Sequence, residues 1–414
     1  METDHLCIGG GPAGVFAALT AAEHGKRCII LEHNKQLGRK LRITGKGRCN
    51  LTNNCDRDTL MANIPANGKF LYSAFSRCTP QDVMAYFEKL GVPLKTERGN
   101  RVFPVSDRAG DVVSALRAYV ERSGVECRKS TVTGLLVKDG ILQGVETAQG
   151  SYRAPKVIVA TGGMSYPRTG STGDGYAFAR QVGHTITPIS GSLVPLEIAG
   201  GECRKLQGMT LRNIGLKLWG KGKKPVYEDQ GELLFMPYGL SGPIILSASA
   251  HMDEKKGPYT LELNLKPALD EKKLDARILR DFAEKQNESI YEGIRGLLPK
   301  DMVPLILDRA GIPTNTPVHE ITKEQRRSIL ETLKRLKFTV AGKRPVEEAI
   351  ITHGGVKVSE VDPKTMESKK CPGLYFAGEV LDVDAYTGGF NLQIAWATAY
   401  AAGTSCGKKN ESVL

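Results

Sequence analysis

The first residues of the chain alternate between apolar runs and a glycine-rich turn. The run HLCIG at residues 5–9 ends in glycine, and Pro12 then opens a segment with apolar residues at helical spacing, which Gly25 closes. A second apolar run, RCIILE, follows directly and ends at Glu32. This order predicts a strand, a tight turn, a helix and a second strand.

Residues 131–160 change to a strand-like alternation. The stretches TVTGLLV, ILQGVETAQG and SYRAP are separated by turn residues and precede the continuous apolar run KVIVATGG. They predict a three-stranded meander that returns the chain to a parallel sheet. Near the C-terminus, residues 374–377 predict a buried strand and residues 391–402 a helix.

The middle of the chain contains two further patterns. Strand-like runs such as LRNIGLKLWG, GELLFM and YTLELNL are separated by glycine, proline and lysine turns up to residue 265. From residue 266 the spacing becomes helical, with an apolar stripe and a capping box at Thr322 and Gln325. The run KFTVAG then returns to a strand pattern.

Composition limits the class of protein. A chain of 414 residues is too long for one hydrophobic core, so we expect two or three domains. The apolar run at residues 6–11 lacks a basic leader, and no run approaches the roughly 20 apolar residues of a membrane span. We therefore expect a cytoplasmic protein with no membrane partner. The nine cysteines include no C-x-x-C, which argues against a zinc site and a disulfide framework, so no metal is expected.

The net charge of +12 fits either nucleic acid or anionic small molecules. The densest basic stretch lies within residues 35–48, directly after the glycine-rich unit. Its position favours the phosphate groups of a bound small molecule.

The motif IGGGPAG has the spacing of a dinucleotide cradle. Gly9 permits the turn, Gly11 lets the backbone approach a pyrophosphate, and Gly14 lets the helix pack on the strand. Glu32, at the end of the next strand, would accept hydrogen bonds from an adenosine ribose. The intervening Pro12 and Ala13 belong to the same predicted cofactor-binding segment.

The later elements favour FAD over NAD as the dinucleotide. A meander followed by an A-T-G turn is similar to FAD-binding domains of the glutathione-reductase type, whereas an NAD-binding domain is expected to have a helical crossover here. Val132 would present its backbone to the adenine. The turn residues that we expect at the cofactor are Ala160, Thr161 and Gly162.

The C-terminal strand and helix complete this pattern. Gly378 and Glu379 follow the strand, and Glu379 or Asp382 could meet the ribityl chain or the pyrophosphate. A helix N-terminus suits the pyrimidine edge of a flavin, where reduction develops negative charge. The residues expected there are Gly389, Phe390, Asn391 and Leu392.

Long motifs over essentially the whole chain resemble the BaiN/YhiN (BaiN/RdsA) family of NAD(P)/FAD-dependent oxidoreductases. They are IGGGPAG, GRKLRITGKGRCNLTN, ATGGMSYPRTGSTGDGYAFARQVGHTI, YGLSGPIILSAS, ITHGGVKVSEVDPKTMESK and GLYFAGEVLDVDAYTGGFNLQIAWATA. The resemblance implies an α/β fold: a discontinuous, glutathione-reductase-type FAD-binding Rossmann-like domain with a β-barrel-like insert and a small helical insert. The expected ranges are 1–190 and 345–414 for the FAD-binding domain, 191–265 and 337–344 for the barrel, and 266–336 for the helices.

By the same resemblance, the basic loop wraps the cofactor. Arg39 and Lys40 would lie on the pyrophosphate side. The residues expected near the isoalloxazine are Gly47, Arg48, Cys49 and Asn50. Cys49 is interpreted either as a reactive thiol near the ring or as a packed neutral thiol.

A flavin carries hydride chemistry, so the protein has to place the substrate and move one proton. Without C-x-x-C a disulfide-reductase mechanism is excluded, and without a second G-x-G-x-x-G unit NAD(P)H would visit the open flavin face only transiently, as the family's naming implies. Candidate proton donors are Tyr166, Arg168, His353 and Tyr386, which lie in glycine- or proline-bounded segments. Histidine titrates nearest neutral pH, although a histidine can also be purely structural.

Three functions remain open at this point. The leading hypothesis is an FAD-dependent oxidoreductase that uses NAD(P)H and acts on an activated C=C or C–C bond of a small organic substrate. The second is a flavin-dependent RNA-modifying protein, for which RRSILETLKRLK would have to present a contiguous basic face. The third is an FAD-binding sensor without turnover. The substrate and the oligomeric state are left open.

Overall fold

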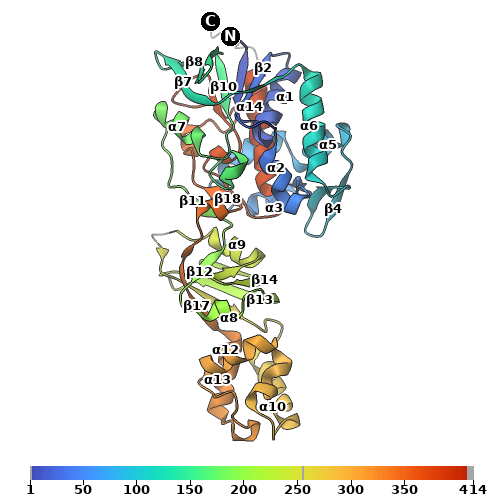
Figure 1. The fold of residues 1–414 in the computed structure, drawn as a ribbon, viewed down its shortest axis with the longest axis vertical. Helices are drawn as coiled ribbons and strands as arrows, with labels where there is room; N and C mark the ends of the chain where they lie inside the picture. The colour runs from blue at the N-terminus through green and yellow to red at the C-terminus, as the bar shows by residue number, and fades with distance from the viewer. Residues whose placement is uncertain (1, 254–255, 408–414) are drawn as a thin grey trace. The chain divides into compact units, whose positions relative to one another are not determined.

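The computed structural model describes residues 2–253 and 256–407, and the chain divides into two compact units (Figure 1). Unit 1 consists of Met1–Ser192 and Pro345–Leu414, and unit 2 is Leu193–Arg344. Unit 2 is therefore an insertion in the chain of unit 1. The predicted division into three domains stays a prediction, and its residues 1, 254–255 and 408–414 lie outside the described residues.

A five-stranded parallel sheet forms the centre of unit 1. Its strand order is β19-β10-β1-β2-β6, and every neighbouring pair is parallel. Four of these strands are almost continuous in apolar residues because both of their faces are covered, whereas the edge strand β6 is mostly polar and exposed. Their bounds are His5–Ile8 (β1), Cys28–Glu32 (β2), Glu126–Lys129 (β6), Lys156–Val159 (β10) and Leu374–Phe376 (β19).

Three long helices cover this sheet. They are α1 (Pro12–Glu23), α6 (Ala109–Ser123) and α14 (Phe390–Gly407), and α1 packs against both of the others (Figure 1). Shorter helices complete unit 1: α2 (Arg39–Ile43), α3 (Arg57–Ala62), α4 (Tyr72–Arg77), α5 (Pro80–Lys89) and α7 (Asp174–Gln181).

Three small antiparallel sheets complete unit 1. The predicted meander is confirmed as β7 (Val132–Lys138), β8 (Ile141–Thr147) and β9 (Gly150–Arg153). A second sheet has the order β3 (Thr52–Asn53), β5 (Arg101–Pro104) and β4 (Leu94–Glu97). In the third, β11 (Ser190–Ser192) pairs with β18 (Ile351–His353).

Unit 2 contains a closed barrel and a group of helices. The barrel order is β12 (Leu196–Ile198), β15 (Gly239–Ser241), β14 (Tyr227–Met236), β13 (Thr210–Trp219), β16 (Tyr259–Asn264) and β17 (Leu336–Lys343). The helices are α8 (Glu202–Lys205), α9 (Pro243–Ser249), α10 (Glu271–Glu284), α11 (Ile290–Ile294), α12 (Val303–Ala310) and α13 (Lys323–Lys334). The predicted capping box at Thr322 and Gln325 is confirmed at the start of α13.

The core of unit 1 is built around α14. Trp396 is fully buried, and its ring lies 5.4 Å from that of Phe16 and 5.3 Å from that of Phe87. Its indole Nε1 donates to the carbonyl of Leu51 at 2.9 Å, so the polar atom is satisfied. Through Trp396, the last helix of the chain, α14, packs against the first helix, α1, and against α5.

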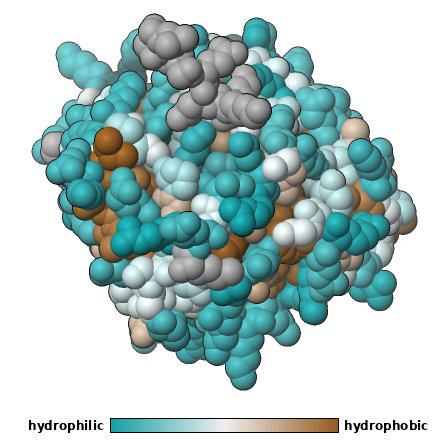
Figure 2. Space-filling model, turned by 90° about the horizontal axis from the view of Figure 1, so that it is seen from above, coloured by the Kyte–Doolittle hydropathy of each residue, from teal (hydrophilic) through white to brown (hydrophobic). Residues whose placement is uncertain are grey.

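The face seen in Figure 2 is mostly hydrophilic, with small separate hydrophobic spots. In the part of the chain that the structure describes, no helix combines the length and the apolar character needed to cross a bilayer.

The contact between α1 and α14 makes the first prediction. A Cβ at Gly403 would lie 2.5 Å from the Ala17 carbonyl oxygen, which cannot move without distorting α1. We expect Gly403→Ala to lower the free energy of unfolding by about 1–3 kcal/mol, in urea unfolding followed by circular dichroism. Gly110→Ala in α6 is the control, because the nearest atom there is 3.6 Å away on a flexible arginine, and we expect it to be neutral or slightly stabilising. Equal effects of the two variants would contradict the packing argument.

A second prediction concerns acid stability. His5 is buried in β1, neither ring nitrogen has a partner among the described residues, and burial lowers its pKa to about 4. Unfolding returns the pKa of His5 to about 6.5. Between about pH 6.5 and pH 4 the unfolded chain therefore binds a proton that the native state does not, and the native state loses stability in this range. We expect His5→Leu to reduce this loss by about 2 kcal/mol between pH 7.5 and pH 5, in urea unfolding at the two pH values. If the free energy of unfolding of His5→Leu depends on pH as that of the unsubstituted protein does, His5 is not the cause of the acid sensitivity.

Candidate functional site

A hollow of about 1340 Å³, partly open to solvent, lies at the carboxyl edge of the parallel sheet in unit 1. All five strands contribute, because the ends of parallel strands meet at one edge. The contributing segments are 8–13 at β1, 31–34 at β2, 130–132 after β6, 160–162 after β10 and 377–379 after β19.

The glycine-rich turn forms the floor of this hollow. Gly9 has φ +106°, and a Cβ at Gly14 would lie 1.9 Å from the Gly9 carbonyl oxygen, so helix and turn are in close contact. Gly11, in contrast, lines the hollow, and a Cβ there would meet no atom within 4 Å. The turn therefore leaves open space where α1 begins, and the backbone N–H groups of a helix N-terminus favour negative charge.

Glu32 anchors the loop after β2 and is itself buried. One carboxylate oxygen accepts a hydrogen bond from the Gly10 backbone N–H at 2.6 Å. The other accepts from the backbone N–H and the side-chain amide of Asn34, at 2.7 and 2.8 Å. Glu32 thus holds the loop beside the glycine turn.

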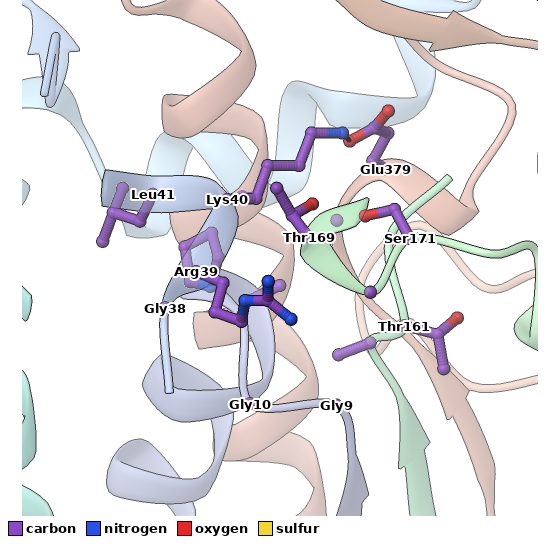
Figure 3. A pocket seen from close by; sticks show the side chains of 18 of the residues that line it. Gly9, Gly10, Gly38, Arg39, Lys40, Leu41, Thr161, Thr169, Ser171 and Glu379 are labelled. Carbon is purple, nitrogen blue, oxygen red and sulfur yellow. Dashed lines mark hydrogen bonds and ion pairs between the residues drawn. The ribbon is translucent and has the colours of Figure 1, made fainter. Parts of the chain in front are cut away.

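A partly buried ion pair crosses the other side of the hollow. The Lys40 ammonium donates to Glu379 at 2.6 Å and to the Ser165 hydroxyl at 2.6 Å, and Figure 3 shows its side chain extending from α2 toward Glu379. The second oxygen of Glu379 accepts from the Ser165 hydroxyl and from the backbone N–H and hydroxyl of Thr352, all within 3.0 Å. A buried charge needs this many partners to be tolerated, and here they join three separate segments.

The basic loop divides between the hollow and its surroundings. Arg39 and Lys40 line the hollow. Arg48 turns toward Glu97 and Asp107, with which it forms ion pairs, and its guanidinium lies 4.0 Å from the centroid of Phe103. Cys49 is fully buried, and burial raises its thiol pKa to about 12, which matches the interpretation as a packed neutral thiol.

Most of the predicted cofactor residues are brought together in the hollow. Those that line it are Gly9, Gly11, Pro12, Ala13, Glu32, Arg39, Lys40, Val132, Ala160, Thr161, Gly162, Gly378, Glu379, Asn391 and Leu392. Those that do not line it are Gly14, Gly47, Arg48, Cys49, Asn50, Asp382, Gly389 and Phe390. Binding itself stays a prediction for both groups.

None of the four candidate proton donors is among the residues that line the hollow. Tyr166 has a left-handed backbone and is 38% exposed, and Arg168 follows it in the same loop. The Tyr386 backbone N–H donates to the Asn63 carbonyl. The His353 Nδ1 lies 2.8 Å from an oxygen of Asp384. The catalytic roles of these residues stay predictions.

Sequence reasoning missed several residues that shape the hollow. Gly10 and Asn34 donate hydrogen bonds to the carboxylate of Glu32. The position of Gly10, in the middle of the sequence GGG, could have indicated its role. Ser165 and Thr352 reach Glu379 from far along the chain, and no local pattern marks such contacts. Across residues 2–253 and 256–407, no three His, Cys, Asp or Glu side chains are grouped as a metal site would require.

Comparison with known proteins gives three informative matches. The 3-dehydro-bile acid delta(4,6)-reductase of Clostridium scindens is 31% identical, over 97% of this chain and 98% of its own. The ribosomal RNA dihydrouridine synthase of Escherichia coli (strain K12) is 29% identical, over 96% of each chain. The solved 3-ketosteroid delta1-dehydrogenase of Sterolibacterium denitrificans has a TM-score of 0.53 at 13% identity, covering 98% of this chain and 99% of its own, and so shares the fold.

These matches agree with the elements described above. The predicted α/β class, with a Rossmann-like domain and a barrel insert, is confirmed, and so is the resemblance to BaiN and RdsA proteins. The model of the family described as "HI0933-like protein Rossmann domain" matches residues 3–405. The chain therefore belongs to the HI0933-like Rossmann-domain family.

Proposed function

We propose that this protein is an FAD-dependent oxidoreductase that reduces a C=C bond conjugated to a carbonyl group, with NAD(P)H as electron donor. The observation that carries the proposal is the hollow at the carboxyl edge of the sheet, where a glycine turn, a helix N-terminus and an anchored carboxylate come together.

The residues present fit FAD. The space in front of Gly11 would take the diphosphate, because a side chain is missing there and α1 begins there. Glu32 would meet the adenosine ribose, and its existing bonds to Gly10 and Asn34 fix its orientation. The hydroxyl of Thr161 is buried at the hollow without a hydrogen-bond partner among the described residues, which a polar ligand would satisfy. When bound, FAD supplies the hydride-transfer chemistry.

The chain's own groups would then orient the bound molecules and stabilise the charge that develops on them. The N-terminus of α14, which brings Asn391 and Leu392 to the hollow, favours negative charge developing there. Apolar residues such as Ile8, Phe178 and Ile351 exclude water from the walls. The pair Lys40–Glu379 keeps α2 and the segment after β19 in fixed positions around the space.

The reaction class follows from what two relatives' names have in common. A delta(4,6)-reductase of a 3-dehydro-bile acid saturates carbon–carbon double bonds conjugated to a ketone. Formation of dihydrouridine from uridine saturates a C=C bond next to a ring carbonyl. Both are hydride additions to a conjugated C=C bond, so we assign that class of reaction to this chain and leave the size of the substrate open.

A small organic substrate is preferred to RNA because of how the cations of residues 326–337, in α13 and at the start of β17, are paired. The predicted basic face is neutralised within unit 2: Arg326 pairs with Asp275, Arg327 with Glu331, Arg335 with Glu271 and Lys337 with Glu262, while Lys334 donates to the carbonyls of Lys266 and Leu269. Such cations contribute little to counterion release. RNA stays a second candidate because the E. coli relative, with 29% identity, is named a ribosomal RNA dihydrouridine synthase.

The first test is the absorption spectrum of the purified protein supplied with FAD, followed by anaerobic addition of NADH or NADPH. We expect the visible band of oxidised flavin and its bleaching by one of the two nicotinamides. Re-oxidation is then followed with a 3-oxo-Δ4,6-steroid and with a uridine-containing ribosomal RNA fragment. Recovery of the band with the steroid supports the small-molecule assignment, and recovery with RNA alone supports the second candidate. Failure to bind FAD would overturn the proposal, and a band that no donor bleaches would favour a sensor.

A substitution at the cradle tests the proposed position of the cofactor. Gly11 is extended (φ −78°, ψ −177°) and lines the hollow, and a Cβ there would have no protein atom within 4 Å. We expect Gly11→Val to weaken FAD binding about 10- to 100-fold in Kd, measured by flavin fluorescence titration, because overpacking costs about 1–3 kcal/mol. The melting temperature of the FAD-free protein should be unchanged. Unaltered affinity would place the diphosphate elsewhere.

A further inference from the structure

A carboxylate that sequence reasoning did not single out holds one of the candidate proton donors. The Nδ1 atom of His353 lies 2.8 Å from Oδ1 of Asp384, whose side chain is only 1% exposed. The other oxygen, Oδ2, accepts a hydrogen bond from the hydroxyl of the fully buried Ser192 at 2.6 Å. Both carboxylate oxygens are therefore occupied, and the carboxylate has a fixed orientation.

Both partners lie on segments that border the hollow. His353 is the last residue of the three-residue strand β18, and the first residue of that strand, Ile351, lines the hollow. Thr352, between them, contacts Glu379. Val383 also lines the hollow, and Asp384 follows it directly.

We propose that Asp384 is a positioning residue that fixes the tautomer and orientation of the His353 imidazole, so that His353 exchanges protons through Nε2. A buried carboxylate without a proton is an acceptor only, so the ring nitrogen facing it carries the hydrogen. The same carboxylate stabilises positive charge on the ring when Nε2 is also protonated. Ser192 contacts the carboxylate and not the ring, so this is an orienting arrangement and not that of an activated serine nucleophile.

The role in turnover rests on the proposed function. Reduction of the conjugated C=C bond needs two electrons, which NAD(P)H supplies and which a bound FAD would pass to one carbon as hydride. One proton goes to the other carbon or to the carbonyl oxygen. His353 gives that proton from Nε2 and becomes the neutral imidazole with its hydrogen on Nδ1, and water returns a proton to Nε2.

A second buried histidine provides the contrast. His184 lies between Glu360 and Ser368, with Nδ1 at 3.2 Å from the carboxylate and Nε2 at 2.6 Å from the hydroxyl. Its side chain has no exposed surface, whereas that of His353 is 36% exposed. Both rings face a carboxylate through Nδ1, but only His353 lies on a strand at the hollow, so Glu360 is the matched control for Asp384.

The test uses the full chain labelled with ¹⁵N-histidine and long-range ¹H–¹⁵N NMR, which distinguishes the two neutral tautomers. His353→Gln assigns the signals of His353. In the unsubstituted protein we expect the neutral form to carry its hydrogen on Nδ1. Asp384→Asn should remove this preference, whereas Glu360→Gln should leave the His353 signals unchanged. Ser192→Ala, which keeps the carboxylate, should retain the tautomer and serves if Asp384→Asn does not fold.

Turnover gives the second readout. With FAD bound, Asp384→Asn should slow re-oxidation by the 3-oxo-Δ4,6-steroid at least about tenfold, whereas reduction by NAD(P)H should keep its rate, because only the former takes a proton from the protein. A hydrogen on Nε2 in the unsubstituted protein, an unchanged tautomer in Asp384→Asn, or equal slowing of both half-reactions would overturn the inference. Protein that binds no FAD would overturn the proposed function instead, while the tautomer measurement would still decide the pairing.

Discussion

The parallel alignment of five strands is the constraint on which the rest of unit 1 depends. Because β1, β2, β6, β10 and β19 all run in one direction, five loops from distant parts of the chain meet at one edge of the sheet. The same alignment buries β1, β2, β10 and β19 almost completely, and α1 and α14 cover the sheet through contacts that leave no room for a side chain at Gly403. The common direction of the five strands thus determines where the helices pack and where the hollow lies.

Buried or largely buried carboxylates then fix the loops that the sheet brings together. Glu32 holds the loop after β2 to the glycine turn, and Glu379 holds α2 and β18 to the segment after β19. Each of these carboxylates has several donors, because an unpaired charge would be costly away from water. Asp384 has the same character, with Ser192 on one oxygen and His353 on the other. The hollow is therefore surrounded by loops held by charge and hydrogen bonds as well as by apolar packing.

Sequence reasoning succeeded where a local pattern has one physical meaning. The strand, glycine turn and helix of residues 5–23, the meander of β7–β9 and the capping box at Thr322 are all local, and each was predicted correctly. It did not find Ser165, Thr352 or Asp384, because their partners lie far along the chain and serine, threonine and aspartate occur everywhere. It also did not foresee that Arg48 pairs with Glu97 and Asp107, acids outside the loop that the motif covers, and the expected place of Arg48 near the isoalloxazine stays a prediction. Motif spacing identifies which segments meet but not which way each side chain turns.

The insertion of unit 2 has a consequence for the order in which the chain can fold during synthesis. The edge strand β19 and the helix α14 both follow unit 2 in the sequence, so the ribosome delivers them after residues 193–344. Until then β10 is an open edge, and α1, buried along most of its length in the finished protein, lacks its main neighbour. Unit 2 is continuous in sequence and can close its barrel while unit 1 is still incomplete. Nascent chains that carry the whole glycine cradle therefore expose apolar surface for the time needed to translate the remaining half of the protein, which makes this stage the one at which chaperone binding matters most.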